Sequence, residues 1–184
     1  MLYRSFARDD SAKDHEPGGA LFVPRWNQGA GRHDNPYEYG TLYASRSPES
    51  AVAEYLQHFR GHSVSSADLK FADGRVLSLA AIADDRIPSL PDLDDPEELL
   101  AQHLRPSRVA TRNREMTQSI ALELFGTGSE GFSWWSTIEA AWINVTLFAE
   151  RAIERLTLAA EPEALTLTHP AVVQAAGELG IPLG

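Results

Sequence analysis

The chain contains no cysteine among its 184 residues. The absence of cysteine excludes disulfide bonds, thiolate zinc sites and cysteine nucleophiles, and it is compatible with a reducing compartment. A metal site would need histidine and carboxylate ligands. His58 and His62 have a metal-ligand spacing, but Gly61 is expected to end the helix between them. We interpret both as surface histidines and expect no metal.

Long apolar segments are also missing. Residues 1–10 mix arginine and aspartate with short apolar pieces, which does not match a signal peptide. No apolar run approaches the roughly 20 residues that a membrane-spanning helix needs. We therefore expect a cytoplasmic protein that does not contact membranes.

Basic residues are scarce. Lys and Arg total 16 against 26 for Asp and Glu, which leaves a formal net charge of −10. A polyanion would be repelled on average, so we expect no direct binding of nucleic acid. Residues 84–98 carry seven acidic side chains and three prolines, which predicts a solvated, irregular connection. Familiar glycine-rich nucleotide loops and the G-x-S-x-G elbow are absent as well.

The patterns that are present predict a mixed α+β fold in one compact domain spanning residues 1–184, with a strand-rich core and flanking helices. Apolar stretches rich in aromatic and β-branched residues predict strands over 2–6, 41–44, 131–135, 144–148 and 156–159. A hairpin is expected over 69–79 around Asp73-Gly74. A polar, glycine-rich loop should occupy 26–36.

Three helices are predicted from capping residues and apolar spacing. Ser47 as N-cap and Pro48 as first residue begin a helix that should stop at Gly61. A second should run over 114–125 with Gly126 as its stop, and a third over 170–179. Trp134, Trp135 and Trp142 are interpreted as core or interface residues.

The stretch 31–58, GRHDNPYEYGTLYASRSPESAVAEYLQH, resembles the RES-domain family. That family has an arginine, then a Gly-x-Leu-Tyr-x-Ser strand, then a Ser-Pro-x-x-Ala-x-x-Glu helix. The opening Leu2-Tyr3-Arg4 and the stretch 131–148, GFSWWSTIEAAWINVTLF, are similar to its first strand and its later Ser and Asn-x-x-Leu-Phe strands. The resemblance covers residues 2–151.

The resemblance implies a fold similar to ADP-ribosyltransferases and an enzyme that consumes NAD. Members hydrolyse or phosphorolyse the nicotinamide–ribose bond, or transfer ADP-ribose to a protein. Many are toxins of toxin–antitoxin pairs, with an antitoxin that has a helix-turn-helix domain and covers the active site with its tail. We expect an NAD-degrading toxin with such a partner. A mono-ADP-ribosyltransferase and a non-catalytic protein-binding module stay open as alternatives.

The resemblance also assigns site residues. The catalytic residues it implies are Arg32, Tyr43, Glu54 and Ser136, and the NAD-binding residues are Arg4, Arg32, Tyr43 and Asn144. Two assignments have alternatives. Ser133 could replace Ser136, which would place the opposite face of the strand toward the substrate. Arg4 or Arg25 could share the phosphate role of Arg32.

The chemistry needs these residue types. Departure of nicotinamide builds positive charge on the ribose, which a carboxylate at Glu54 would stabilise. The pyrophosphate needs a local cation, and Arg32 in a glycine-rich loop supplies one. Tyr43 could stack on nicotinamide while its hydroxyl reaches the ribose. We therefore predict that Glu54 and Arg32 face one dinucleotide-sized hollow.

Without the resemblance, each residue would have an ordinary structural role. Glu54 would be a solvated helix glutamate, Arg32 a mobile loop arginine and Tyr43 a half-buried strand residue. A separate run of arginines could hold a phosphate or an acidic partner, although a solvated face is the favoured interpretation. This run comprises Arg105, Arg108, Arg112 and Arg114.

Overall fold

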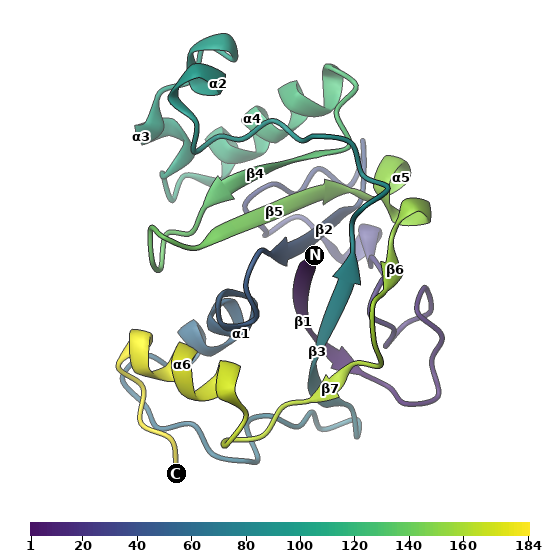
Figure 1. Cartoon of the computed structure of the whole chain (residues 1–184), viewed down its shortest axis with the longest axis vertical. Helices are drawn as coiled ribbons and strands as arrows, with labels where there is room; N and C mark the ends of the chain where they lie inside the picture. The colour runs from purple at the N-terminus through teal and green to yellow at the C-terminus, as the bar shows by residue number, and fades with distance from the viewer. The chain divides into compact units, whose positions relative to one another are not determined.

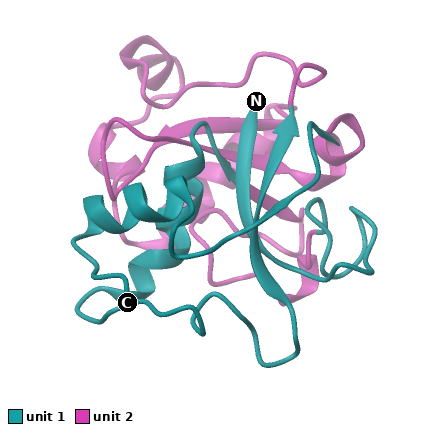
Figure 2. Ribbon diagram, turned by 60° about the horizontal axis from the view of Figure 1, so that its bottom comes forward, with its two compact units in different colours: residues 1–22, 44–83, 157–184 teal, residues 23–43, 84–156 magenta.

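Figure 2 shows the chain divided into two compact units, each assembled from separate stretches of sequence. The structure is a computed structural model and describes all 184 residues. Unit 1 comprises Met1–Phe22, Ala44–Ala83 and Thr157–Gly184, and unit 2 comprises Val23–Tyr43 and Asp84–Leu156. Strand β2 (Thr41–Ser45) contributes its first three residues to unit 2 and its last two to unit 1.

The sheet of unit 1 is built around β3 (Val76–Ala83). Strand β1 (Leu2–Arg8) pairs with it antiparallel along its whole length, from Leu2 opposite Ile82 to Arg8 opposite Val76. Two short strands, β6 (Thr157–Leu158) and β7 (Glu163–Ala164), also pair with β3. On its other side β1 pairs with β2. The predicted first strand is confirmed and is two residues longer than expected.

Two helices of unit 1, α1 (Pro48–Leu56) and α6 (Pro170–Leu179), lie side by side (Figure 1). Ser47 caps α1 as predicted, because its side chain accepts a hydrogen bond from the backbone N–H of Ser50. The expected helix over 48–60 is divided into α1 and a 3-10 turn, η2 (Gln57–Phe59). The bounds of α6 match the prediction.

The hairpin expected over 69–79 is only half formed. The turn at Asp73-Gly74 exists, since the backbone N–H of Phe71 donates to the carbonyl of Arg75 over 2.9 Å. The first arm makes a single bridge, between Lys70 and Val76, and is not a strand. The first arm does not extend as a strand because both edges of β3 are already paired: β1 pairs with one edge, and β6 and β7 pair with most of the other.

Unit 2 contains the antiparallel pair β4 (Gly131–Trp135) and β5 (Ile143–Phe148), with β2 as the other neighbour of β5. Helix α4 (Arg114–Gly126) packs on β4. It includes Gly126, the predicted stop, and the left-handed turn comes at Gly128. Shorter elements complete the chain: η1 (Arg25–Asn27), α2 (Pro96–Ala101), α3 (Pro106–Val109), α5 (Ala149–Ala152) and η3 (Ile153–Arg155).

The apolar core of unit 2 lies between α4 and the β4–β5 pair. Its buried aromatic members include Tyr39, Phe132, Trp134 and Phe148, and Trp135 packs against it from the side. Trp142 is buried as well. The interpretation of Trp134, Trp135 and Trp142 as packing residues is therefore confirmed.

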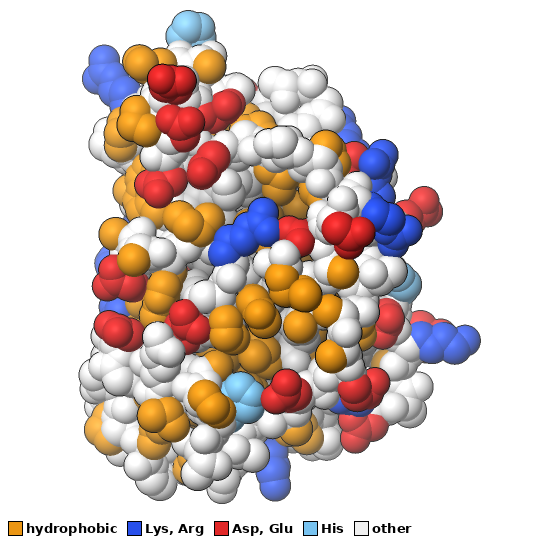
Figure 3. Space-filling view, in the orientation of Figure 1, with side chains coloured by type: hydrophobic (Ala, Val, Ile, Leu, Met, Phe, Trp, Pro, Cys, Tyr) orange, Lys and Arg blue, Asp and Glu red, His pale blue; other side chains and the backbone are white.

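The acidic segment 84–98, predicted to be an irregular connection, contains the start of a helix. Acidic side chains gather in the region of α2 on the face shown in Figure 3, and most of those in residues 84–98 are exposed. However, Asp95 caps α2 by accepting from the backbone N–H of Glu97 over 2.9 Å, and Pro96 is the first helical residue. Proline at that position begins a helix because its missing N–H would have no partner there anyway.

The architecture is mixed α and β, as predicted. No helix is both long enough and apolar enough to span a bilayer.

Candidate functional site

Asp34 organises the glycine-rich loop of unit 2. Its carboxylate Oδ2 accepts hydrogen bonds from the backbone N–H groups of Gly29 and Gly31, over 2.9 and 2.7 Å. A β-carbon on Gly31 would lie about 2.5 Å from this carboxylate, so a larger residue would force the carboxylate out of its place. The loop is therefore folded around a buried negative charge.

Tyr43 binds the same loop from β2. Its hydroxyl donates to Oδ1 of Asp34 and accepts from the backbone N–H of His33, both over 2.8 Å. Burial, with Asp34 nearby, raises the pKa of Tyr43, so the hydroxyl keeps its proton. The sequence analysis assigned that hydroxyl to a ribose oxygen. In the structure it is used within the protein, and the half-buried ring is the part that can meet a ligand.

His33 lies beneath this network and is only 2% exposed. Its Nδ1 is 2.8 Å from Oγ1 of Thr146, which also accepts from the indole N–H of Trp134. The imidazole meets the rings of Phe132 and Trp134 edge-on. Burial, and then the charges of Arg32 and Arg114, hold the pKa of His33 well below its usual value. The ring is therefore neutral at physiological pH.

Arg32 is buried rather than mobile. Its side chain is 8% exposed, and Nη1 donates to the backbone carbonyls of Val109 and Thr111 over 3.1 and 2.7 Å. The guanidinium carbon lies 5.1 Å from the ring centre of Trp134, a cation–π distance. The interpretation of Arg32 as a mobile loop residue is therefore wrong. Its contacts include two backbone carbonyls and one aromatic face.

Arg25, which the sequence analysis allowed to share the phosphate role of Arg32, is paired with a carboxylate. Its Nη1 is 2.7 Å from Oε1 of Glu150, and its Nε donates to the carbonyl of Pro36 over 2.6 Å. A guanidinium already paired with a carboxylate is less able to bind an anionic phosphate. That Arg25 shares the phosphate role stays a prediction.

The two candidate serines differ in what their hydroxyls do. Ser133 on β4 donates to Oδ1 of Asp92 over 2.9 Å, beside the bridge between these two residues. Ser136 follows β4, is buried, and accepts from the backbone N–H of Ile138 over 3.1 Å. The hydroxyl of Ser136 thus accepts a hydrogen bond without donating one within the protein, whereas the hydroxyl of Ser133 donates to Asp92.

Asn144 lies opposite Trp134 in the register of β4 and β5 and is buried. Side chains two positions apart on a strand share a face, so Asn144 and Thr146 point the same way. Unit 2 therefore brings Asn144 to the same face as the Trp134–Thr146–His33 contacts. His33 and Asp34 were not predicted as site residues, although both stand inside the recognised motif directly after Arg32.

Glu54 and Arg4 belong to unit 1. Glu54 is half-buried near the end of α1, where its Oε2 accepts from the side-chain amide of Gln57 over 2.8 Å. Arg4 on β1 donates through Nη1 to the carbonyls of Ala20 and Phe22 over 2.6 and 3.1 Å. Burial lowers the pKa of Arg4 to about 10, so it remains charged. That Glu54 and Arg32 face one hollow stays a prediction.

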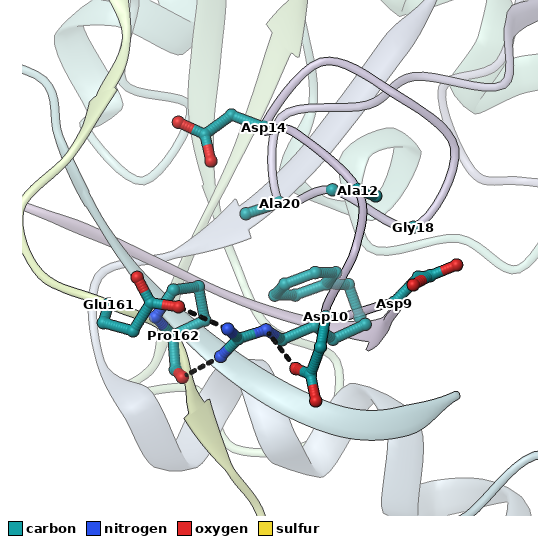
Figure 4. Close-up of a pocket in the computed structure, with 11 residues that line it drawn as sticks. Asp9, Asp10, Ala12, Asp14, Gly18, Ala20, Glu161 and Pro162 are labelled. Atoms are coloured by element: carbon teal, nitrogen blue, oxygen red, sulfur yellow. Dashed lines mark hydrogen bonds and ion pairs between the residues drawn. The ribbon is translucent and has the colours of Figure 1, made fainter. Parts of the chain in front are cut away.

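A polar pocket of unit 1, shown in Figure 4, is lined by none of the predicted site residues. Arg8 lies in it and contacts Asp10, Glu161 and the carbonyl of Pro162. The acidic lining is thus partly neutralised. No group of three or more histidine or carboxylate side chains in the structure could hold a metal ion.

Comparison with known proteins identifies the family. A protein-family model for the RES domain matches residues 1–168. The chain belongs to the RES-domain family. The match includes every predicted site residue and extends beyond the stretch 2–151 on which the resemblance was based.

One solved relative of this RES-domain chain shares its fold. It is a chain in the crystal structure of the M. tuberculosis MbcT-MbcA toxin-antitoxin complex, with a TM-score of 0.62 and 14% sequence identity. The similarity covers 97% of this chain and 88% of that chain. No curated protein sequence matches the chain significantly.

Proposed function

We propose that this RES-domain protein cleaves the nicotinamide–ribose bond of NAD and acts as the toxin of a toxin–antitoxin pair. The observation that carries the proposal is the membership of the family over residues 1–168. The resemblance adds Arg32, Tyr43, Glu54 and Ser136 as the catalytic residues that we propose. The hydrogen bonds that position Arg32 support it, because a site for an anionic dinucleotide needs a cation held in place.

The proposed mechanism relies on positioning and electrostatics. As nicotinamide leaves with the bonding electrons, the ribose becomes an oxocarbenium-like cation, which the carboxylate of Glu54 stabilises. Arg32 binds the pyrophosphate, and the ring of Tyr43 stacks on the nicotinamide end. Ser136 and Asn144 hydrogen-bond the amide or ribose. Water, phosphate or a protein side chain then attacks the ribose carbon.

The partner proposed for this chain is an antitoxin. The structurally similar chain comes from a complex described as toxin-antitoxin, which supports a partner of that kind here. We propose that this antitoxin carries a helix-turn-helix domain and that its tail covers the NAD site in the cytoplasm. Such a cover would suppress NAD loss until the antitoxin is removed.

Incubation of the pure chain with NAD, with and without inorganic phosphate, tests the reaction. Release of nicotinamide with ADP-ribose indicates hydrolysis, and ADP-ribose 1-phosphate indicates phosphorolysis. Label from NAD retained on protein would indicate the alternative transferase. If NAD neither binds nor releases nicotinamide, the proposal is wrong and a protein-binding module becomes the better assignment.

Glu54→Gln should abolish nicotinamide release while the circular dichroism spectrum is unchanged, because the carboxylate charge is lost with little change in shape. Glu49→Gln, on the same helix α1, is the matched control and should retain activity. Equal activity of the two variants would contradict the role of Glu54.

A further inference from the structure

Four arginines of unit 2 lack any counter-ion. Arg105, Arg112 and Arg114 are exposed and Arg108 is half-buried. None of the four side chains forms an ion pair or a hydrogen bond. No acidic residue lies between Glu98 and Glu115. We call residues 105–114 the arginine strip.

Three of the other arginines of unit 2 have partners in the structure, whereas the exposed Arg86 forms no ion pair or side-chain hydrogen bond. Arg25 pairs with Glu150, and Arg155 pairs with Glu130 at 3.2 Å. Arg151 donates to two backbone carbonyls and stacks on the ring of Phe125. Carboxylates are plentiful in a chain of net charge −10. The absence of any carboxylate from the arginine strip therefore leaves an unusual local excess of positive charge.

The arginine strip is attached directly to Arg32. The guanidinium of Arg32 holds the backbone carbonyls of Val109 and Thr111, which lie in the middle of the strip. The hydroxyl of Thr117, in the first turns of the following helix, donates to the carbonyl of Arg32. Arg114 is close enough for its charge to act on His33, the neighbour of Arg32. The backbone of the strip is therefore held directly against the residue to which the pyrophosphate is assigned.

Like charges repel one another, and a bound anion would relieve that repulsion. We propose that Arg108, Arg112 and Arg114 attract and bind the phosphate groups of the dinucleotide substrate around Arg32. The proposal rests on the proposed function for the identity of the ligand. We favour a dinucleotide phosphate over an acidic protein as the ligand. The strip is attached to Arg32, which is only 8% exposed, and a small anion reaches such a residue more easily than a protein surface does.

The test is the salt dependence of NAD cleavage by the full chain. The variant Arg108→Gln/Arg112→Gln/Arg114→Gln removes three charges from the strip. At low ionic strength its KM for NAD should rise roughly tenfold, and the difference from wild type should shrink at high ionic strength, because salt screens exposed charges. Arg86→Gln is the control: this exposed arginine of unit 2 stands beside Asp84 and Asp85, outside the strip.

Titration with ADP-ribose separates this proposal from the proposed function. ADP-ribose contains the pyrophosphate but has no bond to cleave, so its affinity reports on the strip even if no NAD is consumed. Weaker, less salt-dependent binding by the triple variant would support the strip as a phosphate site. Wild-type affinity, KM and salt dependence in a folded triple variant would overturn it, whether or not the wild-type chain cleaves NAD.

Discussion

The phenol of Tyr43 donates a hydrogen bond of 2.8 Å to the carboxylate of Asp34. This hydrogen bond joins β2 to the glycine-rich loop that carries Arg32. The same carboxylate accepts from two loop N–H groups. Two motif positions, Arg32 and Tyr43, are thus held together by a residue between them in sequence. The position of the loop that carries Arg32 therefore depends on Asp34 and Tyr43 through hydrogen bonds within the protein.

Tyr43→Phe should destabilise the fold by about 1–2 kcal/mol, because it leaves Asp34 without one donor and the N–H of His33 without its acceptor. Urea unfolding measures the change. Tyr37→Phe is the control, since Tyr37 is 88% exposed, and its effect should stay within about 0.5 kcal/mol. Equal losses in the two variants would contradict the importance of the Tyr43 hydroxyl.

Asp34→Ala should cost more stability than Asp34→Asn. The alanine variant leaves the N–H groups of Gly29 and Gly31 without their acceptor, a loss of about 2–3 kcal/mol for bonds to a charged group. In the asparagine variant the amide oxygen can still accept from both. Thermal or urea unfolding should therefore rank wild type above Asp34→Asn and Asp34→Asn above Asp34→Ala; the reverse order of the two variants would refute this account of the loop.

The free energy of unfolding should decrease as the pH is lowered through the mildly acidic range. The folded state holds the pKa of His33 well below its usual value, so below about pH 6.5 the unfolded chain binds a proton that the folded chain does not. Stability due to neutral His33 is complete above that pH. It is lost on acidification, by at most about 1.4 kcal/mol per pH unit.

Urea unfolding between pH 7.5 and 5 would measure this slope, in wild type and in His33→Gln. The variant should be less stable at neutral pH, because it disturbs the contact with Thr146, but its pH slope should be shallower. Parallel slopes for the two proteins would show that other groups dominate the acid response.

Ser136→Ala should lower kcat/KM for NAD more than Ser133→Ala does. The hydroxyl of Ser136 accepts a hydrogen bond without donating one within the protein, whereas Ser133 donates to Asp92. Ser133→Ala should instead lower the free energy of unfolding, by about 1 kcal/mol, through loss of that hydrogen bond. The opposite pattern would assign the functional serine to position 133.

Capping residues and apolar spacing correctly predicted the start of α1 and both ends of α6. Ser47 and Pro48 begin α1, and α6 spans the predicted residues, because capping and apolar spacing act within a few positions. The hairpin over 69–79 was only partly right, since the edges of β3 are taken by strands distant in sequence. Helix α2 was missed because the prolines and acidic residues of the segment 84–98 suggested an irregular connection, although Pro96 is the first residue of the helix.

The amino-acid sequence by itself determined the mixed α and β class, the main strands and helices, and the motif that places the chain in the RES-domain family. Only the tertiary structure decided the state of the motif side chains. Arg32 is buried against carbonyls 77 and 79 positions away, and His33 contacts Thr146, 113 positions away. Contacts at such separation leave no periodic or local signal, because they arise when distant segments pack together and must satisfy each other's polar groups.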